Sequence, residues 1–444
     1  MNLLKLSWKN LVFQPLNLLL VVVLFALGVG LVSFLLNINQ QLEENFNKNL
    51  AGIDLVIGAK GSPLQLILSS MYHVDNPTGN VSIQSAKPFL NPRHPLIARA
   101  VPLSLGDSYR SFRIVGTTYD ILQLYGARLA QGRLWKADME VVVGAAAADR
   151  LHLHIGDTFK SSHGLVEGIE EHEHDFRVVG ILAPTGSVID QLILTNTSSI
   201  WLSHEHENSM AADSLIHAEH AGHAHEHDQA HAHEVVEAEM PDSLTLQQMA
   251  EEQRLELMSH PEKQITSILI TFRSRTNIQA LNMGRNINEN TDLMAASPPN
   301  EIARLQTTMG QGASTLQWLA WVIVFVSGLS VFISLYASLK ERRYELALVR
   351  VMGGTRRTLF VLIVLEGLLL SLLGYVAGMV VSHAGLGVVA HLLEQSYRYT
   401  FTGLKFLPEE GWLLVGSLLV GLLAALIPAW QARNTDISET LARG

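Results

Sequence analysis

The sequence predicts a membrane protein with four transmembrane α-helices and a large α+β extracytoplasmic domain between the first and second helices. Three observations predict this fold class. Hydrophobic residues make up 48% of the 444 residues, and the mean hydropathy of +0.22 is higher than a soluble chain usually shows. Four segments are long and apolar enough to cross a bilayer. About 275 residues separate the first two of them, enough for a folded domain.

The predicted spans cover residues 16–37, 316–339, 359–381 and 411–430. Lys5 and Lys9 precede the first span, as they would in a cleaved signal peptide. The apolar region of the first span is too long for a cleaved signal peptide and no A-x-A site follows it, so we expect an uncleaved anchor. Residues 1–15 are predicted to lie as a helix in the cytoplasmic headgroup layer, and residues 431–444 form a tail.

The connection between the second and third spans sets the predicted orientation. Residues 340–358 carry one lysine and five arginines against two glutamates, so the positive-inside rule places them in the cytoplasm. Both termini are then cytoplasmic, while residues 38–312 and a short loop at 382–410 are exported. The charge agrees, because residues 38–312 hold 19 Lys and Arg against 33 Asp and Glu, and the rest holds 12 against 8.

The exported domain is predicted to mix strands and helices. Residues 38–50 continue the first span as an amphipathic helix, and residues 300–311 lead into the second span in the same way. We call these two predicted helices stalks. Apolar runs predict strands, and helical patterns lie between them. The strands are expected at 54–57, 112–115, 140–143, 176–182, 191–194 and 265–272, and the helices at 118–124, 145–151 and 277–290.

Several chemistries are excluded by residue content. The chain has no cysteine, which removes disulfides, cysteine metal sites and cysteine nucleophiles. Residues 58–63 read Gly-Ala-Lys-Gly-Ser-Pro, which is not the Gly-Lys-Ser/Thr order of a phosphate-binding loop, and no other Walker-type segment appears. No basic stretch is interleaved with aromatic residues, so nucleic acid is not an expected partner.

Residues 341–357, ERRYELALVRVMGGTRR, followed by a span that bears Glu366, resemble the cytoplasmic coupling segment of MacB/FtsX-like (type VII) ABC transporter permeases. The chain's end, PAWQAR at 428–433 and DISETL at 436–441, resembles the family's ending, although Ile437 stands where proline is common. Residues 141–144, 153–159 and 176–186 resemble the family's periplasmic core domain.

The resemblance implies a non-catalytic permease subunit in a bacterial inner membrane, with its large domain in the periplasm. It implies a second permease copy, forming a homodimer, and a cytoplasmic ABC ATPase on each copy, so that ATP acts only through the partner. ATP-driven closure would pass through the stalks to the periplasmic domains, without substrate crossing the membrane. Membrane lipid and a periplasmic accessory or substrate-binding protein are further expected partners.

The cytoplasmic segment 340–358 is predicted to contain a short charged helix that ends at two glycines and docks on the ATPase. A plain topogenic basic loop is the alternative, but topogenesis alone needs no apolar helix face. The candidate ATPase-coupling residues are Arg342, Arg343, Glu345, Leu348, Arg350, Gly353, Gly354 and Arg356.

Glu366 lies about eight residues into the third predicted span, where a carboxylate is costly and usually faces protein or water. Its place near the cytoplasmic side favours a role in helix packing. A role in proton transfer is the alternative.

A histidine-rich insertion, expected at about residues 203–260, is predicted to be flexible, because it is acidic and poor in large apolar residues. Interleaved imidazoles and carboxylates without competing positive charge suit Zn²⁺ and, less selectively, Ni²⁺, Cu²⁺ or Co²⁺. We therefore expect metal binding, over many equivalent ligand sets. The candidate ligands are His217, His220, His223, His225, His227, His231 and His233.

A third candidate site lies near the start of the exported domain. Glycines and prolines imply fixed turns there, which suit a substrate gate or the docking of an accessory protein, and ordinary packing is equally compatible. The candidate gate or docking residues are Lys60, Gly61, Ser62, Pro63 and His73.

Three functions remain open from the sequence. The first is an ABC transporter permease, linked to zinc or other transition-metal homeostasis or to export or extraction of a peptide, lipoprotein or small molecule. The second is an FtsX-like signalling subunit that regulates an envelope enzyme. The third, a membrane-anchored metallohydrolase, is disfavoured because no H-E-x-x-H motif occurs.

Overall fold

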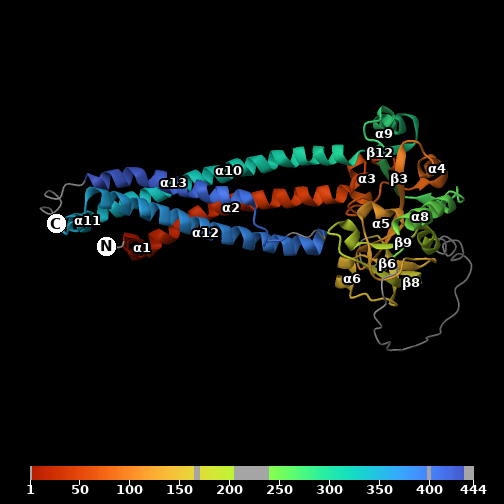
Figure 1. Cartoon of the computed structure of the whole chain (residues 1–444), viewed down its shortest axis with the longest axis horizontal. Coiled ribbons are helices and arrows are strands. Elements are labelled where there is room, and N and C mark those ends of the chain that lie inside the picture. Colours follow the sequence, from red (N-terminus) through yellow and green to blue (C-terminus); the bar gives the residue numbers. More distant parts are fainter. Residues whose placement is uncertain (1–2, 165–170, 205–239, 398–401, 435–444) are drawn as a thin grey trace, which may run out of the picture. The chain divides into compact units, whose positions relative to one another are not determined.

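The computed structural model describes residues 3–164, 171–204, 240–397 and 402–434 of the chain (Figure 1). The chain divides into two compact units. We call residues 1–44 and 306–444 the helical unit, and residues 45–305 the sheet unit. Both divisions fall inside long helices, so two helices belong covalently to both units.

Four long helices make up most of the helical unit: α2 (Pro15–Leu50), α10 (Pro298–Glu341), α12 (Arg356–Tyr397) and α13 (Pro408–Arg433). Each contains a stretch apolar and long enough to cross a membrane. Its described residues also form two short helices, α1 (Leu3–Phe13) and α11 (Arg343–Val351). The two predicted stalks are helical, because α2 continues to Leu50 and α10 begins at Pro298.

The predicted connection at 382–410 is largely helical in the part that the structure describes. The helix α12 continues to Tyr397, and α13 already begins at Pro408. No proline occurs between residues 382 and 397, and Leu386 is completely buried, so packing favours helix over loop. Pro408 is the first residue of α13, a position where its missing N–H costs nothing.

Glycines let the long helices approach closely. A Cβ on Gly374 of α12 would lie 2.7 Å from the Phe25 side chain of α2, and one on Gly378 would lie 2.9 Å from the Ala26 carbonyl oxygen. Helices α12 and α13 meet in the same way, since a Cβ on Gly421 would lie 2.3 Å from Ser371 Oγ. Small residues at helix crossings are the usual means of packing inside a membrane.

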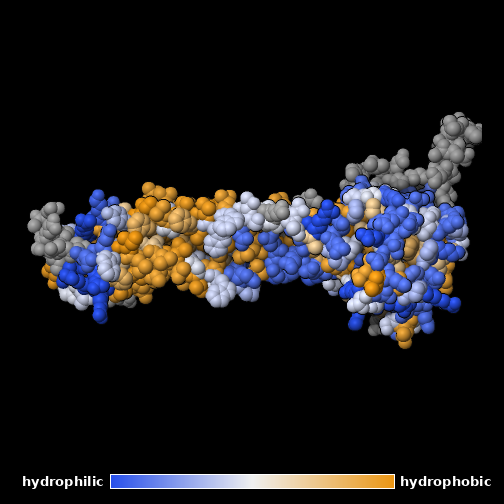
Figure 2. Space-filling model, turned by 90° about the horizontal axis from the view of Figure 1, so that it is seen from above, coloured by the Kyte–Doolittle hydropathy of each residue, from blue (hydrophilic) through white to orange (hydrophobic). Residues whose placement is uncertain are grey.

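The outer surface of the helical unit is apolar along much of its length (Figure 2). Large hydrophobic side chains of the spanning helices remain exposed, among them Leu20, Trp318, Phe325 and Val380. An exposed apolar surface of this kind is expected where lipid, rather than water, is the surrounding solvent.

The sheet unit is built on a ten-stranded mixed sheet with the order β12-β1-β11-β3-β4-β9-β6-β8-β5, while β7 pairs with β3 and β8. Most neighbours are antiparallel, but β4 and β9 are parallel, as are β6 and β8. The strands are β1 (Leu55–Ala59), β3 (Ile97–Tyr109), β4 (Phe112–Thr117), β5 (Leu129–Gly132), β6 (Glu140–Val143), β7 (Thr158–His163), β8 (Glu171–Leu182), β9 (Ile193–Asn196), β11 (Ser267–Phe272) and β12 (Leu293–Ala296). A second sheet pairs β2 (Val81–Ser82) with β10 (Gln264–Ile265).

Helices cover this sheet and enclose two apolar cores. The helices are α3 (Pro63–Ser70), α4 (Ile83–Leu90), α5 (Asp120–Tyr125), α6 (Ala145–Leu151), α8 (Ser243–Leu257) and α9 (Ile278–Asn290), with a 3-10 turn at Val188–Gln191 and a helical segment at 197–204. The predicted fold class, four apolar helices and a mixed domain after the first, is confirmed.

The predicted flexible insertion at 203–260 is too long. Residues 243–257 form α8, which begins at Asp242, whose carboxylate accepts the Thr245 N–H at 3.3 Å. Leu246, Ala250 and Leu257 are buried, so the helix packs on the domain by one face. These few apolar residues at helical spacing stabilise the segment, although its overall composition is polar.

Candidate functional site

The short helix α11 lies between the second and third spanning helices. It begins after Arg342 and ends at Met352, and Gly353 follows with a φ of +98° that favours glycine. Gly354 donates its N–H to the Val349 carbonyl oxygen at 2.9 Å, and a Cβ at Gly354 would lie 2.7 Å from that oxygen. The predicted helix that ends at two glycines is therefore confirmed.

One face of α11 is fixed to the helical unit. Leu346 and Ala347 are buried, at 3% and 1% exposure. Leu346 belongs to an apolar cluster drawn from the nearby ends of four other helices, and this cluster gives α11 a defined position. The cluster comprises Leu339, Leu346, Leu359, Leu362, Ile363, Ala429 and Ala432, with Leu3 and Leu6 of α1 packed against it.

The opposite face of α11 is apolar and open. Leu348, Val351 and Met352 are 44%, 61% and 71% exposed. Charged side chains surround them, and among the predicted coupling residues Arg343, Glu345 and Arg356 are exposed while Arg350 is half-buried. An apolar centre with a charged rim has the composition of a protein docking surface. We call Leu348, Val351 and Met352 with Arg343, Glu345 and Arg356 the α11 surface.

Arg342 does not belong to this surface. Its guanidinium points inward, with Nη1 3.5 Å from Glu366 Oε1 and Nε 3.2 Å from Glu345 Oε2. Glu366 is buried at 1% exposure and also accepts a 2.7 Å hydrogen bond from Asn10 Nδ2 of α1. A buried carboxylate that meets a guanidinium and an amide is satisfied by its neighbours. These contacts connect α1, the end of α10 and α12.

Asn10 was not a predicted site residue. A lone asparagine in an amphipathic segment gives no sequence signal for a partner 356 positions away. Ser7 Oγ adds a 3.4 Å hydrogen bond to the Leu362 carbonyl oxygen, and Gln14 Nε2 one of 2.5 Å to Glu341. Ser7 and Asn10 therefore fix α1 to α12, and Gln14, just after α1, binds the end of α10.

A second buried polar cluster joins α2, α12 and α13. Glu410 Oε1 accepts hydrogen bonds from Ser33 Oγ at 2.8 Å and Asn37 Nδ2 at 2.7 Å, and His383 Nε2 lies 3.3 Å away. His383 Nδ1 is 2.7 Å from the Gly403 carbonyl oxygen, which can only accept, so Nδ1 carries a hydrogen. These contacts join α2 and α12 to the buried Glu410 carboxylate of α13.

The predicted gate residues form the start of α3. The Ser62 hydroxyl accepts the Gln65 N–H at 3.4 Å as the helix N-cap, and Pro63 occupies the first helical position. Gly61 allows close approach, because a Cβ there would lie 2.9 Å from the Thr78 side chain. Lys60 is exposed in the turn after β1. All of these features are those of a well-packed turn.

His73 is separated from that turn by α3. It adopts a left-handed backbone with a φ of +53°, and its Nδ1 is enclosed with no hydrogen-bond partner within the described chain. Burial, and secondarily the Arg113 guanidinium, lower the pKa of His73 to about 3. The imidazole is therefore neutral at physiological pH.

Two family models match the chain. The FtsX-like permease C-terminal model matches residues 318–437, which include α11, α12 and α13. The MacB-like periplasmic core domain model matches residues 18–282, more than half of the chain. The chain belongs to the MacB/FtsX-type ABC transporter permeases. Comparison with curated proteins gave no match.

Membership of this family gives the general function of the permease. It is a membrane component of an ABC transporter, the family is one of non-catalytic permease subunits, and the family implies an ABC ATPase partner. The α11 surface lies in the part matched by the FtsX-like model, and residues 45–282 of the sheet unit lie in the part matched by the MacB-like model.

The predicted metal ligands, His217 to His233, lie outside the described residues of the permease. Among the residues that the structure does describe, no group of three or more His, Asp or Glu side chains is arranged to hold a metal ion. His204, the last described residue before the tract, packs against the sheet, with Nε2 3.3 Å from the buried Asp107 carboxylate. Metal binding by the tract stays a prediction.

Proposed function

We propose that this permease couples a cytoplasmic ABC ATPase, docked on the α11 surface, to its sheet unit in the periplasm. The observation that carries the proposal is the open face of α11, with Leu348, Val351 and Met352 exposed although the opposite face is rigidly packed. A rigid helix with an exposed apolar centre and charged rim suits a groove on a partner protein.

The basic connection around α11 supports a cytoplasmic position for this surface, with both termini on the same side and the permease in the inner membrane. Two copies of the permease would form a homodimer, and an ATPase on each copy would complete the assembly. ATP would be bound and hydrolysed by the partner alone.

Mechanotransmission is the proposed mode of action. Crossing a bilayer requires about 20 helical residues, whereas α2 has 36 and α10 has 44. Each helix therefore extends beyond its apolar stretch into the residues of the sheet unit. A continuous helix transmits displacement along its axis because its backbone hydrogen bonds keep its length fixed.

The docking proposal is tested by co-purification of the permease with its ABC ATPase partner. Leu348→Glu with Val351→Glu should reduce ATPase retention by roughly tenfold or more, because two buried apolar contacts would be replaced by desolvated charges. Leu404→Glu is the matched control, since Leu404 is 86% exposed in the connection before α13. Full ATPase retention by a folded double variant would overturn the proposal.

We also propose that the histidine tract captures Zn²⁺ or a related divalent metal, which links the transporter to metal homeostasis. Support comes from the composition of residues 217–233, seven histidines with interleaved carboxylates and no lysine or arginine. Because metal competes with protons for imidazole, binding should weaken between pH 7 and pH 5.

Calorimetric titration of the full chain with Zn²⁺ tests this second proposal. A variant with the seven tract histidines replaced by glutamine should lose the heat of high-affinity Zn²⁺ binding. A variant that replaces His152 and His154, outside the tract, should keep it. Equal heats from wild type and the seven-histidine variant would refute metal capture. Loss of the ATPase gene would produce metal sensitivity under this proposal, and a cell-wall defect if the complex instead regulates an envelope enzyme.

A further inference from the structure

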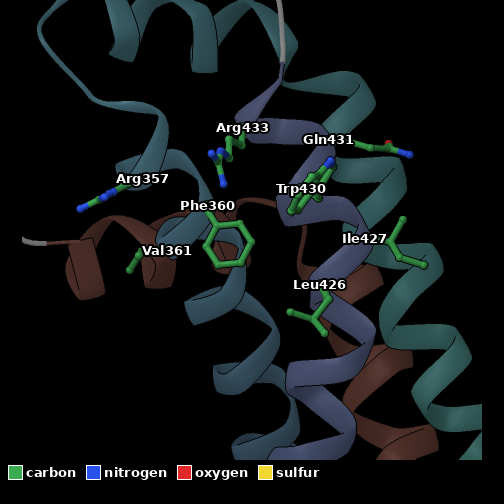
Figure 3. Close-up of a pocket in the computed structure, with 8 residues that line it drawn as sticks. All are labelled: Arg357, Phe360, Val361, Leu426, Ile427, Trp430, Gln431 and Arg433. Carbon is green, nitrogen blue, oxygen red and sulfur yellow. The ribbon is translucent and has the colours of Figure 1, made fainter.

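A groove of about 730 Å³ lies between the start of α12 and the end of α13 (Figure 3). Phe360 and Val361 of α12 and Leu426, Ile427 and Trp430 of α13 give it an apolar wall. Arg357, Gln431 and Arg433 line it at one end, and none of the described residues that line it is acidic. The groove is thus apolar with a cationic end.

The two helices present the same order of side chains along the groove. Moving inward from the helix ends, α12 offers Arg357, then Phe360 and Val361, while antiparallel α13 offers Arg433, then Trp430, then the pair Leu426 and Ile427. Residues three and four apart share one helix face, so both helices carry arginine nearest their ends and apolar side chains further inward. This order matches a phospholipid, with phosphate, glycerol region and acyl chain at successive depths.

The arginines are available for an anionic group. Within the described chain neither Arg357 nor Arg433 forms an ion pair with a carboxylate, and the Arg433 guanidinium lies 5.5 Å from the centroid of the Trp430 ring. Figure 3 shows Arg433 directed into the space above Phe360, with Arg357 on the far side of α12. Arginine binds phosphate oxygens with two parallel hydrogen bonds, and tryptophan favours the membrane interface.

We infer that this groove binds an anionic phospholipid, with its phosphate at Arg433, Arg357 adding positive charge at the rim, and one acyl chain along Val361, Leu426 and Ile427. A second copy of the chain fits less well, because two-fold pairing through the groove would bring the arginines of both copies together. A zwitterionic lipid would add a cation beside two guanidinium groups. Charge therefore selects a lipid with net negative charge.

The test measures lipid retained by the full-length permease after reconstitution with equal dioleoyl-phosphatidylglycerol and dioleoyl-phosphatidylcholine, followed by native mass spectrometry. Wild type should retain phosphatidylglycerol preferentially, and Arg357→Gln with Arg433→Gln should lower that preference on the order of tenfold. Lys5→Gln with Lys9→Gln is the matched control. It removes two positive charges from α1, which packs at the same end of the bundle.

Ile427→Trp provides a second variant that fills the groove without changing its charge, and it should also reduce retention. An unchanged preference in the arginine variant would overturn the inference, as would an equal loss in the lysine control, which would indicate a general effect of surface charge. A shift in the fraction of dimer without any change in bound lipid would assign the groove to contact between copies and would also overturn it.

Discussion

Asp120 shows how a single residue organises the sheet unit. This buried carboxylate of α5 has Arg254 Nε of α8 at 3.2 Å and Arg99 Nε of β3 at 4.0 Å, and it accepts a hydrogen bond from Thr118 Oγ1 at 3.0 Å. Burial raises the pKa of Asp120, while Arg254, Thr118 and Arg99 lower it. The buried Asp120 carboxylate therefore needs these partners, and its ion pair with Arg254 joins α8 to α5.

Replacing Arg254 by methionine should leave this carboxylate without its nearest cation. We expect a loss of about 3 kcal/mol in the stability of α8, the usual cost of breaking a buried pair from one side. Hydrogen exchange of the α8 amides measures it directly. Arg285→Met is the control, because the Arg285–Glu289 pair is 75% and 64% exposed and should contribute little. Similar effects from both substitutions would contradict a special role for Asp120.

His73 makes the sheet unit sensitive to acid. Its pKa is about 3 in the folded chain and about 6.5 when unfolded, so between these values the unfolded state binds more protons. Stability should therefore fall as pH drops below about 6.5, by about 2 kcal/mol between pH 7.5 and pH 5. His73→Asn tolerates the left-handed backbone and removes the titration.

Denaturant titrations of both proteins at the two pH values, followed by tryptophan fluorescence, test this prediction. The other histidines change the stability of both proteins equally on acidification. The difference between the stability losses of wild type and the asparagine variant is therefore due to His73. If wild type and the asparagine variant lose the same stability on acidification, His73 is not buried in neutral form.

At the scale of elements, α2 and α12 pack closely because α12 has glycines, which lack side chains, where the helices cross. Gly378→Ala would place a Cβ 2.9 Å from the Ala26 carbonyl oxygen, whereas Gly387→Ala meets nothing within 4 Å. Replacing glycine by alanine should therefore destabilise the protein at one position and stabilise it at the other. We expect Gly378→Ala to destabilise by about 1–3 kcal/mol, and Gly387→Ala to stabilise by up to about 1 kcal/mol through helix propensity. Thermal unfolding in detergent measures both, and equal shifts would argue against close packing at Gly378.

Elements with regular patterns were predictable from sequence. Residues 140–143 and 145–151 were predicted as strand and helix and occur as β6 and α6, because their apolar runs end at clear turns. The longest strand, β3, was not predicted. Its pattern contains Pro102 and Gly106, and its register with β4 shifts between Leu105 and Ser108, so alternation is lost.

The candidate site was predicted in part for a similar reason. The α11 helix and its glycine end follow from local sequence. The inward turn of Arg342, the partners of Glu366 and the cluster around Glu410 depend on residues hundreds of positions apart. Local patterns carry no information about such contacts, which only tertiary packing creates.

At the scale of the whole molecule, the proposed transmission requires an unbroken α2. Asn47 lies exposed in the part of α2 that belongs to the sheet unit. Asn47→Pro removes a backbone hydrogen bond and kinks the helix, while Asn47→Ala preserves it. The proline variant should retain its ATPase, because the α11 surface is unchanged.

Hydrogen exchange of the reconstituted complex, with and without ATP, measures this transmission. We expect ATP to change the exchange of the sheet unit in wild type and in Asn47→Ala, and to leave it unchanged in Asn47→Pro. A nucleotide response that survives the proline would rule out α2 as the transmitting element.

The contacts of α1 also set an order of assembly. Ser7 and Asn10 bind partners 355 and 356 residues later in the chain. At a synthesis rate of about 5–20 residues per second, roughly 20–70 seconds pass before those partners leave the ribosome. During that time α1 lacks these two hydrogen bonds to α12, and the membrane surface can cover its apolar side chains. Although α1 is made well before α12, it is therefore late to reach its final contacts, and insertion of the third span is what completes them.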